Sequence, residues 1–339
     1  MDTRMIEWVT AGRIAVETCT RLQPGEQALI VTDTLIREAK GARELIDAVF
    51  AAARYVGAET SIIEFTARDQ PNAELPSAVA GAMREANVVF TLPTRPPSHT
   101  QATRKARDAG ARVLMLASGT SIGNDDVLYR LAPRSADELE EWARLTSKLK
   151  EMFRKGGTLH VTTNQGTDIT CDVGKLEVHA MDGICHTPGT ISHFIAGLAG
   201  GGPTPGSTSG TLVVDAGITP IWRPLTNESP VRLEIKDGQV IGVEGGPAAA
   251  EWKHAAESLN DPTAYNIAEY GFGCHPRAQV PHGRPMEDER LYGGFHLGIG
   301  SSTGFGGKVQ SKWHIDASCT KATATLNGRQ FLEDGVYSV

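Results

Sequence analysis

Residues 24–32, with the sequence PGEQALIVT, place a turn signal directly before a short run of strand-forming residues. A helical pattern with one apolar face follows over about residues 39–55. The same cycle recurs along the chain, with strand-like runs at residues 60–65, 86–91 and 111–116. Short apolar strands that alternate with helices are typical of a parallel sheet covered by helices. The first part of the chain is therefore predicted to be an α/β domain built on a parallel sheet.

The pattern changes after a helical stretch over residues 136–154, which ends at a pair of glycines. A chain of 339 residues is also too long for one ordinary core and fits two domains. We therefore predict an α/β domain over residues 1–155 and a strand-rich α+β domain over residues 156–339. The strand-like runs of the second half are residues 158–162, 210–215 and 231–235, and residues 236–239 (KDGQ) predict a hairpin.

The composition excludes several classes of protein. Hydrophobic residues make up 40% of the chain and charged residues 22%, which is typical of a globular protein. Lys and Arg number 33 against 40 Asp and Glu, so a net charge of −7 gives no general attraction to nucleic acid. No apolar run reaches the ~18–20 residues of a membrane span. No GxGxxG follows the first strand and no GxxxxGK[ST] occurs, so no nucleotide cofactor is expected.

The cysteines and the first residues predict the cellular compartment. Cys19, Cys171, Cys185, Cys274 and Cys319 are widely spaced and form no CxxC. An odd number without pair spacing indicates reduced thiols and argues against a disulfide framework or a zinc knuckle. The N-terminal segment carries acids early and lacks the apolar region of a signal peptide. A cytoplasmic location is therefore expected.

Three short segments in the last part of the chain carry the candidate chemistry. His314 and Asp316 lie two apart in a strand-like stretch, so both side chains point to one face and can reach one metal ion. His296 lies within an apolar strand pattern. Glu269 interrupts an apolar, glycine-rich stretch, where a buried carboxylate must be paired or bound to a metal. Two imidazoles and two carboxylates suit iron, zinc or manganese. The alternatives are a surface His–Asp pair and a hydrogen-bonded core histidine.

These residues also carry a family resemblance. Between residues 210 and 328 the chain resembles the family that joins the 2,5-dihydroxypyridine 5,6-dioxygenases to the thermophilic metallo-aminopeptidases. The order and spacing of the matching segments hold throughout this stretch, and a weaker similarity extends over most of the chain. The matching segments are residues 210–215 (GTLVVD), 260–262 (NDP), 271–273 (GFG), 276–279 (PRAQ), 306–308 (GGK) and 314–316 (HID).

The two branches of this family imply different metal sites. The dioxygenases hold one Fe(II) with two histidines and one aspartate. His314 and Asp316 match two of these ligands, but Glu269 occupies the position of the other histidine unless His296 supplies that imidazole. The aminopeptidases hold two metal ions, and all four residues match that branch. However, Thr190 stands where that branch has a further glutamate, and a tyrosine expected just after the His296 strand is absent. The loss of two ligands favours one metal ion.

Two histidines earlier in the chain match the dioxygenase branch by spacing. His99 follows an apolar strand and resembles the histidine proposed as the catalytic base of the dioxygenases. A loop at the C-terminal end of a parallel strand is where α/β sheets place ligands. His193 resembles a histidine that contacts the substrate. The alternative is that both are exposed loop histidines without a catalytic role.

The resemblance therefore implies a mononuclear non-heme Fe(II) dioxygenase. It would use O₂ to open the ring of a hydroxylated N-heteroaromatic, dihydroxypyridine-like or related phenolic compound. Glu269, His314 and Asp316 would hold the metal, with His296 close by. One alternative is a metal-dependent hydrolase, an aminopeptidase or amidase that uses Zn²⁺ or Mn²⁺. Another is a small-molecule binding protein without activity. The family also implies a homo-oligomer.

Overall fold

The computed structural model of the protein describes residues 3–38, 41–69, 72–98, 100–116, 125–225 and 230–339. The chain divides into two compact units. The first unit comprises Met1–Ala143 and Met181–Ala196, and the second unit comprises Arg144–Ala180 and Gly197–Val339. Helix α6 (Ala136–Arg154) contains the first crossing of the chain from one unit to the other.

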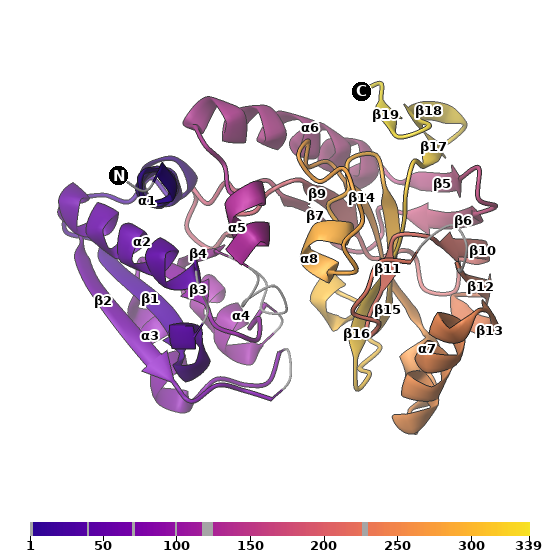
Figure 1. The fold of residues 1–339 in the computed structure, drawn as a ribbon, viewed down its shortest axis with the longest axis horizontal. Coiled ribbons are helices and arrows are strands. Elements are labelled where there is room, and N and C mark those ends of the chain that lie inside the picture. Colours follow the sequence, from indigo (N-terminus) through magenta and orange to yellow (C-terminus); the bar gives the residue numbers. More distant parts are fainter. Residues whose placement is uncertain (1–2, 39–40, 70–71, 99, 117–124, 226–229) are drawn as a thin grey trace. The chain divides into compact units, whose positions relative to one another are not determined.

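A five-stranded parallel sheet forms the centre of the first unit, in the order β2-β1-β3-β4-β8 (Figure 1). β3 and β4 are buried along their whole length, as expected of strands covered on both faces. The predicted parallel α/β sheet is confirmed. The strands are β1 (Gln27–Asp33), β2 (Glu59–Phe65), β3 (Val88–Leu92), β4 (Arg112–Met115) and β8 (Ile191–His193).

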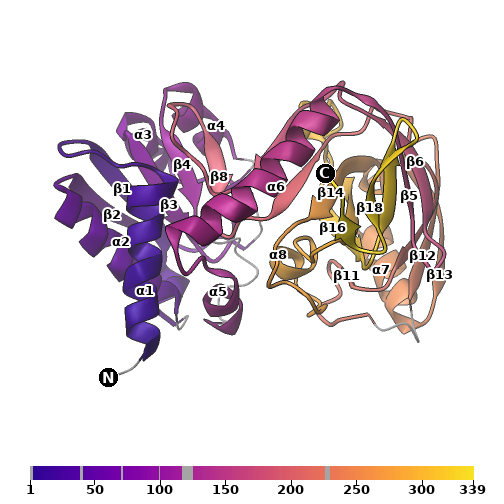
Figure 2. The same cartoon turned by 90° about the horizontal axis from the view of Figure 1, so that it is seen from above.

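Helices cover both faces of this sheet. Successive side chains of a strand point to opposite faces, so a strand made of apolar residues needs cover on both. On one face, Met83 of α3 and Ala106 of α4 pack in one cluster with Val31 and Val113 of the strands. The neighbouring strand residue Ile30 is also fully buried, and α2 covers that opposite face (Figure 2). The helices are α1 (Thr3–Arg13) with a π-helical continuation (Ile14–Cys19), a 3-10 helix (Thr34–Glu38), α2 (Ala42–Val56), α3 (Ser77–Glu85), α4 (Gln101–Asp108) and α5 (Asp125–Leu131).

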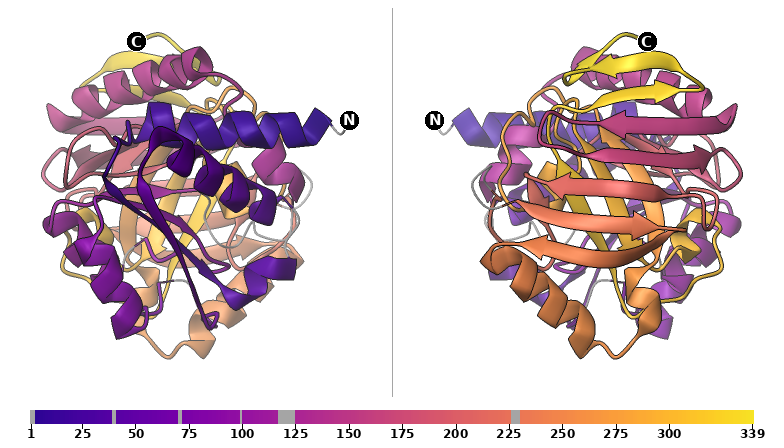
Figure 3. Two further views of the ribbon diagram at one scale, coloured as in Figure 1. Left: turned by 90° about the vertical axis from the view of Figure 1, so that its left-hand side faces the viewer. Right: turned by 90° about the vertical axis from the view of Figure 1, so that its right-hand side faces the viewer.

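The second unit consists of two sheets that share one apolar core. The right-hand view of Figure 3 looks onto the first of them, in the order β13-β12-β10-β6-β5-β17-β18-β19. The other sheet has the order β11-β16-β15-β14-β9-β7. The strands are β5 (Gly157–Thr162), β6 (Asp168–Val173), β7 (Val178–Met181), β9 (Leu198–Gly201), β10 (Ser209–Val214), β11 (Gly217–Ile218), β12 (Val231–Lys236), β13 (Gln239–Gly245), β14 (Ile267–Gly273), β15 (Phe295–Gly300), β16 (His314–Cys319), β17 (Thr323–Leu326), β18 (Arg329–Glu333) and β19 (Val336–Tyr337).

The predicted hairpin joins β12 to β13. Lys236 pairs with Gln239, while Asp237 and Gly238 have φ values of 51° and 75°, which a two-residue turn of this kind requires. α7 (Pro247–Ser258) packs against these two strands and buries Trp252. Short helices precede β14 (Pro262–Tyr265), precede β15 (α8, Pro285–Asp288) and follow it (Thr303–Phe305). Among the described helices, none combines the length and apolar character that crossing a bilayer would require.

The two faces of the six-stranded sheet differ in character. Tyr270, Leu297 and Ile315 of its three central strands belong to the core shared with the eight-stranded sheet. Because side chains alternate along a strand, the residues between them point away from this core. These include Glu269 and His296, so the sheet presents its candidate chemistry on the face opposite the core.

Candidate metal centre

The register of β14, β15 and β16 brings the four residues predicted to bind metal onto one face. Gly298 of β15 lies opposite both Glu269 of β14 and Asp316 of β16. His296 precedes Gly298 by two residues and His314 precedes Asp316 by two, so both imidazoles share that face. A register shift between Ile267 and Glu269 helps to set this alignment. The prediction that His314 and Asp316 lie on one strand face is confirmed.

Glycines on the neighbouring strands make room for these side chains. A Cβ atom at Gly298 would lie 2.7 Å from Cβ of Glu269 and 2.9 Å from Cε1 of His314, closer than real Cβ atoms approach other atoms. A Cβ atom at Gly271, which lies opposite His296, would overlap the imidazole ring. The glycine-rich sequences of β14 and β15 therefore provide the space into which the cluster is packed.

Glu269 lies between the two histidines. Its Oε2 is 3.1 Å from Nε2 of His314, and its Oε1 is 3.5 Å from Nε2 of His296. Nε2 of His314 is also 3.9 Å from Oδ1 of Asp316. The other ring nitrogen of His314, Nδ1, lies 2.8 Å from the carbonyl oxygen of Ser301. Since a carbonyl only accepts, Nδ1 carries a hydrogen and donates it, which directs Nε2 into the cluster.

Among the residues that the structure describes, two groups of three have the spacing of metal ligands. Glu269, His314 and Asp316 can each offer one ligand atom with all atoms within 4.8 Å of one another, and so can Glu289, His296 and Asp316. Asp316 belongs to both groups. Glu289, which follows α8, was not among the residues predicted from the sequence. Its only signal was an acidic run at residues 287–289, and such a run is usually a solvated face.

Several polar atoms of the cluster lack the hydrogen bonds that burial requires. Within the part of the chain that the structure describes, Nδ1 and Nε2 of His296 and Oδ1 of Asp316 are buried without a hydrogen-bond partner. His296 is only 1% exposed. Buried polar atoms almost always have a partner, so these atoms indicate a bound group. A divalent first-row metal ion fits this donor set of imidazoles and carboxylates.

The charges in the cluster depend strongly on one another. Burial alone would lower the pKa of His314, but the hydrogen bond to Glu269 and the charges of Asp316 and Glu269 outweigh it and raise this pKa to about 9. Burial alone would raise the pKa of Glu269. Its interactions with His296 and His314 outweigh burial and hold this pKa well below its usual range. Burial and the charges of Glu289 and Glu269 raise the pKa of Asp316 to about 7. Without a metal ion the cluster therefore retains protons that the ion would displace.

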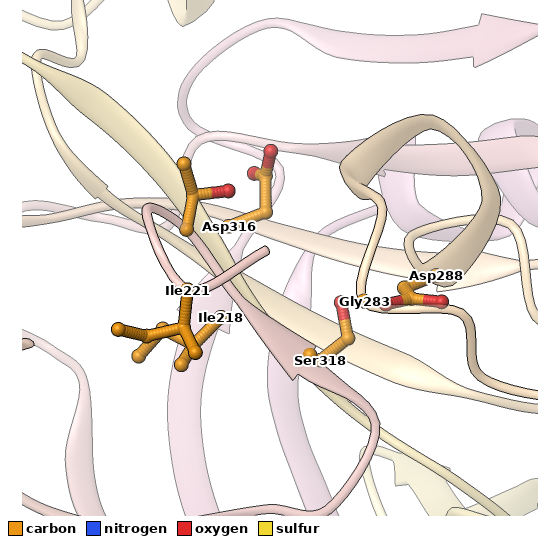
Figure 4. Close-up of a pocket in the computed structure, with 8 residues that line it drawn as sticks. Ile218, Ile221, Gly283, Asp288, Asp316 and Ser318 are labelled. Carbon is orange, nitrogen blue, oxygen red and sulfur yellow. The ribbon is translucent and has the colours of Figure 1, made fainter. Parts of the chain in front are cut away.

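A small pocket adjoins Asp316 (Figure 4). Ile218 and Ile221 form its apolar side, while Asp316 and Ser318 reach it from β16. Asp288 also lines it, but both of its carboxylate oxygens accept backbone N–H groups of the preceding loop, from His282 at 2.8 Å and Arg284 at 3.0 Å. The remaining lining residues are Gly217, Thr219 and Gly283. The pocket therefore lies beside one carboxylate of the cluster.

The geometry of this cluster does not test the two predicted catalytic histidines. His193 is the last residue of β8 in the first unit, where it lies opposite Met115 of β4. It therefore stands at the C-terminal end of a parallel strand, where such sheets place ligands. His99 lies outside the described residues. The proposed roles of both histidines stay predictions.

Comparisons with known proteins identify similar chains. The family model for 2,5-dihydroxypyridine 5,6-dioxygenase matches residues 7–338. A curated 2,5-dihydroxypyridine 5,6-dioxygenase of Pseudomonas putida is 28% identical over 228 residues, which are 64% of this chain and 62% of that protein. The aligned part thus spans a little less than two thirds of the relative's length.

Two solved structures share the fold. The structure of 2,5-dihydroxypyridine dioxygenase from Pseudomonas putida KT2440 superposes with a TM-score of 0.83 at 21% identity, covering 99% of this chain and 98% of that one. AmpT from Thermus thermophilus superposes with a TM-score of 0.65 at 13% identity, covering 98% and 99%. The resemblance described from the sequence is confirmed.

Proposed function

The chain belongs to the 2,5-dihydroxypyridine 5,6-dioxygenase family, and from this we propose that it is a metal-dependent dioxygenase that opens an aromatic ring. The proposed substrate is a hydroxylated N-heteroaromatic compound of the dihydroxypyridine kind or a related phenol. In the overall reaction both atoms of O₂ enter the product and one carbon–carbon bond of the ring breaks. The name of the curated relative, which specifies a dihydroxypyridine and the ring bond that is cleaved, supports this class.

The observation that carries the proposal is the buried cluster on β14, β15 and β16, with its unpartnered imidazole and carboxylate atoms. In this proposal Glu269, His314 and Asp316 hold one Fe(II), with His296 next to them. A bound Fe(II) would supply the redox chemistry by which O₂ reacts with the ring.

The side chains of the protein have distinct tasks in this proposal. The hydrogen bond from His314 to the carbonyl of Ser301 fixes the direction of Nε2. The carboxylates of Glu269 and Asp316 offset the charge of the ion. The imidazole of His99 takes the proton of a substrate hydroxyl, since histidine is the side chain best suited to proton transfer at neutral pH. Loss of this proton makes the ring more electron-rich, and His193 contacts the polar edge of the ring.

A metal-dependent hydrolase is the second candidate. Glu269 favours it, because a carboxylate at this position matches the aminopeptidase branch of the resemblance. The second group of ligand-like residues, Glu289, His296 and Asp316, also favours it, since a site for two ions needs a shared carboxylate. In this alternative Zn²⁺ or Mn²⁺ would activate a water molecule, and the substrate would be a peptide or an amide.

Oxygen uptake distinguishes the two candidates. The metal-free protein is loaded with Fe(II) under anaerobic conditions and mixed with oxygenated 2,5-dihydroxypyridine or catechol. The proposal predicts that O₂ is consumed one-to-one with substrate by the iron-loaded protein. The zinc-loaded protein and the matched variant Asp316→Asn should consume none. Absence of uptake with every dihydroxypyridine and catechol, together with hydrolysis of an aminoacyl arylamide by the zinc- or manganese-loaded protein, would replace the dioxygenase with the hydrolase.

Two further expectations from the sequence belong to this proposal. The protein is expected to act in the cytoplasm and to form a homo-oligomer. Sedimentation of the purified protein measures the second of these directly.

A further inference from the structure

The candidate metal centre has two halves that share Asp316. Glu269 and His314 complete one half, and Glu289 and His296 complete the other. Sharing of one carboxylate between two groups of ligands is the arrangement by which proteins hold two metal ions close together. By its ligand geometry alone, the cluster could therefore take up two ions.

A buried guanidinium pairs with Glu289 in the second half of the cluster. Nη1 of Arg290 pairs with Oε1 of Glu289, and it also donates to the carbonyl oxygen of Met286 at 3.0 Å. The side chain of Arg290 is only 1% exposed, while that of Glu289 is 15% exposed. The carbonyl holds the guanidinium in position, so this pair differs from the mobile ion pairs of a protein surface. One carboxylate oxygen of Glu289 is thereby already bound to a positive group.

The guanidinium of Arg290 places a positive charge directly beside the carboxylate of Glu289. A metal ion bound by the same carboxylate would bring a second positive charge next to it. Neighbouring buried charges of one sign are strongly unfavourable, so an ion in this half would bind far more weakly than an ion held by Glu269 and His314.

We infer that Arg290 restricts the centre to one metal ion. Its guanidinium takes the place that a second ion would occupy beside Glu289, and it supplies positive charge there without offering an open coordination position. Arg290 thus determines how many metal ions bind: it favours a site for one ion in a cluster that has enough ligands for two ions. The inference rests on the metal centre of the proposed function and concerns the number of ions that this centre binds.

Metal stoichiometry of the full-length protein tests this inference. The metal-free protein is titrated with Mn²⁺ in equilibrium dialysis without substrate, and the bound ions are counted. Electron paramagnetic resonance then shows whether neighbouring ions are magnetically coupled.

The wild type should bind one Mn²⁺ with an uncoupled spectrum. Arg290→Gln, which removes the charge, should bind a second Mn²⁺ that couples to the first. Arg290→Lys, the matched variant that keeps the charge, should stay at one ion. Two ions in the wild type, or one ion in a folded Arg290→Gln, would overturn the inference.

If Arg290→Gln does not fold, a second pair of variants tests whether Arg290 limits the number of bound ions. Since Arg290 already binds Glu289, the Glu289→Gln variant should keep the wild-type affinity for the first Mn²⁺ within about tenfold. Glu269→Gln should weaken it by more than about 100-fold, because loss of a direct ligand costs more than loss of an outer contact. Equal losses in both variants would contradict the inference. These measurements use neither substrate nor O₂, so a failure of the dioxygenase assay would leave their outcome intact. A wild type that binds no ion would overturn the metal centre itself.

Discussion

Each of the four candidate ligands on the three central strands of the metal centre lies opposite a glycine. His296 lies opposite Gly271, Glu269 and Asp316 lie opposite Gly298, and His314 lies opposite Gly300. The alternation of a strand is enough to predict from the sequence that His314 and Asp316 share a face. The partner of each glycine could not be predicted, because the pairing depends on a register shift in β14. Glu289 also could not be predicted, since the loop that carries it reaches the cluster only through tertiary packing.

Substitution of Gly271 tests the role of these glycines. Gly271→Ala would place a methyl group into the ring of His296. We expect a loss of about 1–3 kcal/mol of unfolding free energy through overpacking, together with weaker metal binding. Gly81→Ala is the matched control, because Gly81 lies in α3 with no atom within 4 Å of the added methyl group. It should leave the protein as stable as before or stabilise it by up to about 1 kcal/mol. Equal effects in chemical denaturation would contradict this explanation of the glycine pattern.

Glu269 lies at one of the positions where the two branches of the family resemblance imply different metal ligands. Glu269→Ala should lose metal as completely as His314→Ala or Asp316→Ala while the fold persists, because each ligand provides a large share of the affinity. Glu269→His would provide the ligand set of the dioxygenase branch and should retain iron. Metal analysis of the dialysed variants measures both effects. His99→Ala should keep its metal and lose most turnover, since a base holds no ion. Normal metal content in Glu269→Ala would show that His296, His314 and Asp316 form the site.

At the scale of elements, one aspartate fixes the approach to β16. Oδ2 of Asp261 accepts hydrogen bonds from Ser311 Oγ at 2.9 Å and from the N–H of Lys312 at 2.8 Å, just before His314. Its Oδ1 accepts from the N–H and hydroxyl of Thr263. The regular elements that this segment connects could be predicted from apolar periodicity. The anchor itself could not, because Asp261 and Ser311 are far apart in the sequence and nothing in their local patterns relates them.

The charge of Asp261 should make its contribution to stability depend on pH. The hydrogen bond from Thr263 and those from the segment at residues 311–312 hold the pKa of this carboxyl well below its usual range. The stabilisation is therefore present above the ordinary aspartate pKa of about 3.9 and is lost as the pH falls towards the lower value in the folded protein. Asp261→Ala should be less stable than the wild type at pH 7, and the difference should shrink in acid. A difference that stays constant between pH 7 and pH 3 in urea denaturation would contradict this assignment.

For the whole molecule, the strand and helix cycle of the first unit and the strand-rich character of the second could both be predicted from the sequence. The return of residues 181–196 to the first unit could not. β8 is only three residues long, and its pairing with β4 is a contact between segments far apart in the chain. Short strands carry too few residues for a periodic signal. Because residues 181–196 belong to the first unit, His193 lies at the end of the parallel sheet. A division of the chain into two consecutive domains would not suggest this position.

Metal binding should stabilise the second unit as a whole. All the candidate ligands lie on strands and loops of this unit, so an ion that binds only the folded state raises its stability. At 100 times the dissociation constant the gain is about 2.7 kcal/mol, which corresponds to roughly 5–11 °C for a unit of this size. Thermal denaturation with and without Mn²⁺ measures the shift. Asp316→Asn should show little or none of it, and an equal shift in that variant would place the ion elsewhere.

The central claim is that this protein adds both atoms of O₂ to an aromatic substrate, and isotope labelling tests it most directly. The iron-loaded enzyme is mixed with 2,5-dihydroxypyridine under ¹⁸O₂ in unlabelled water, and the ring-opened product is analysed at once by mass spectrometry. The dioxygenase account predicts a product that carries two ¹⁸O atoms, with ordinary mass when the label is supplied as H₂¹⁸O. A product that takes its new oxygen only from water would contradict the account and indicate hydrolysis.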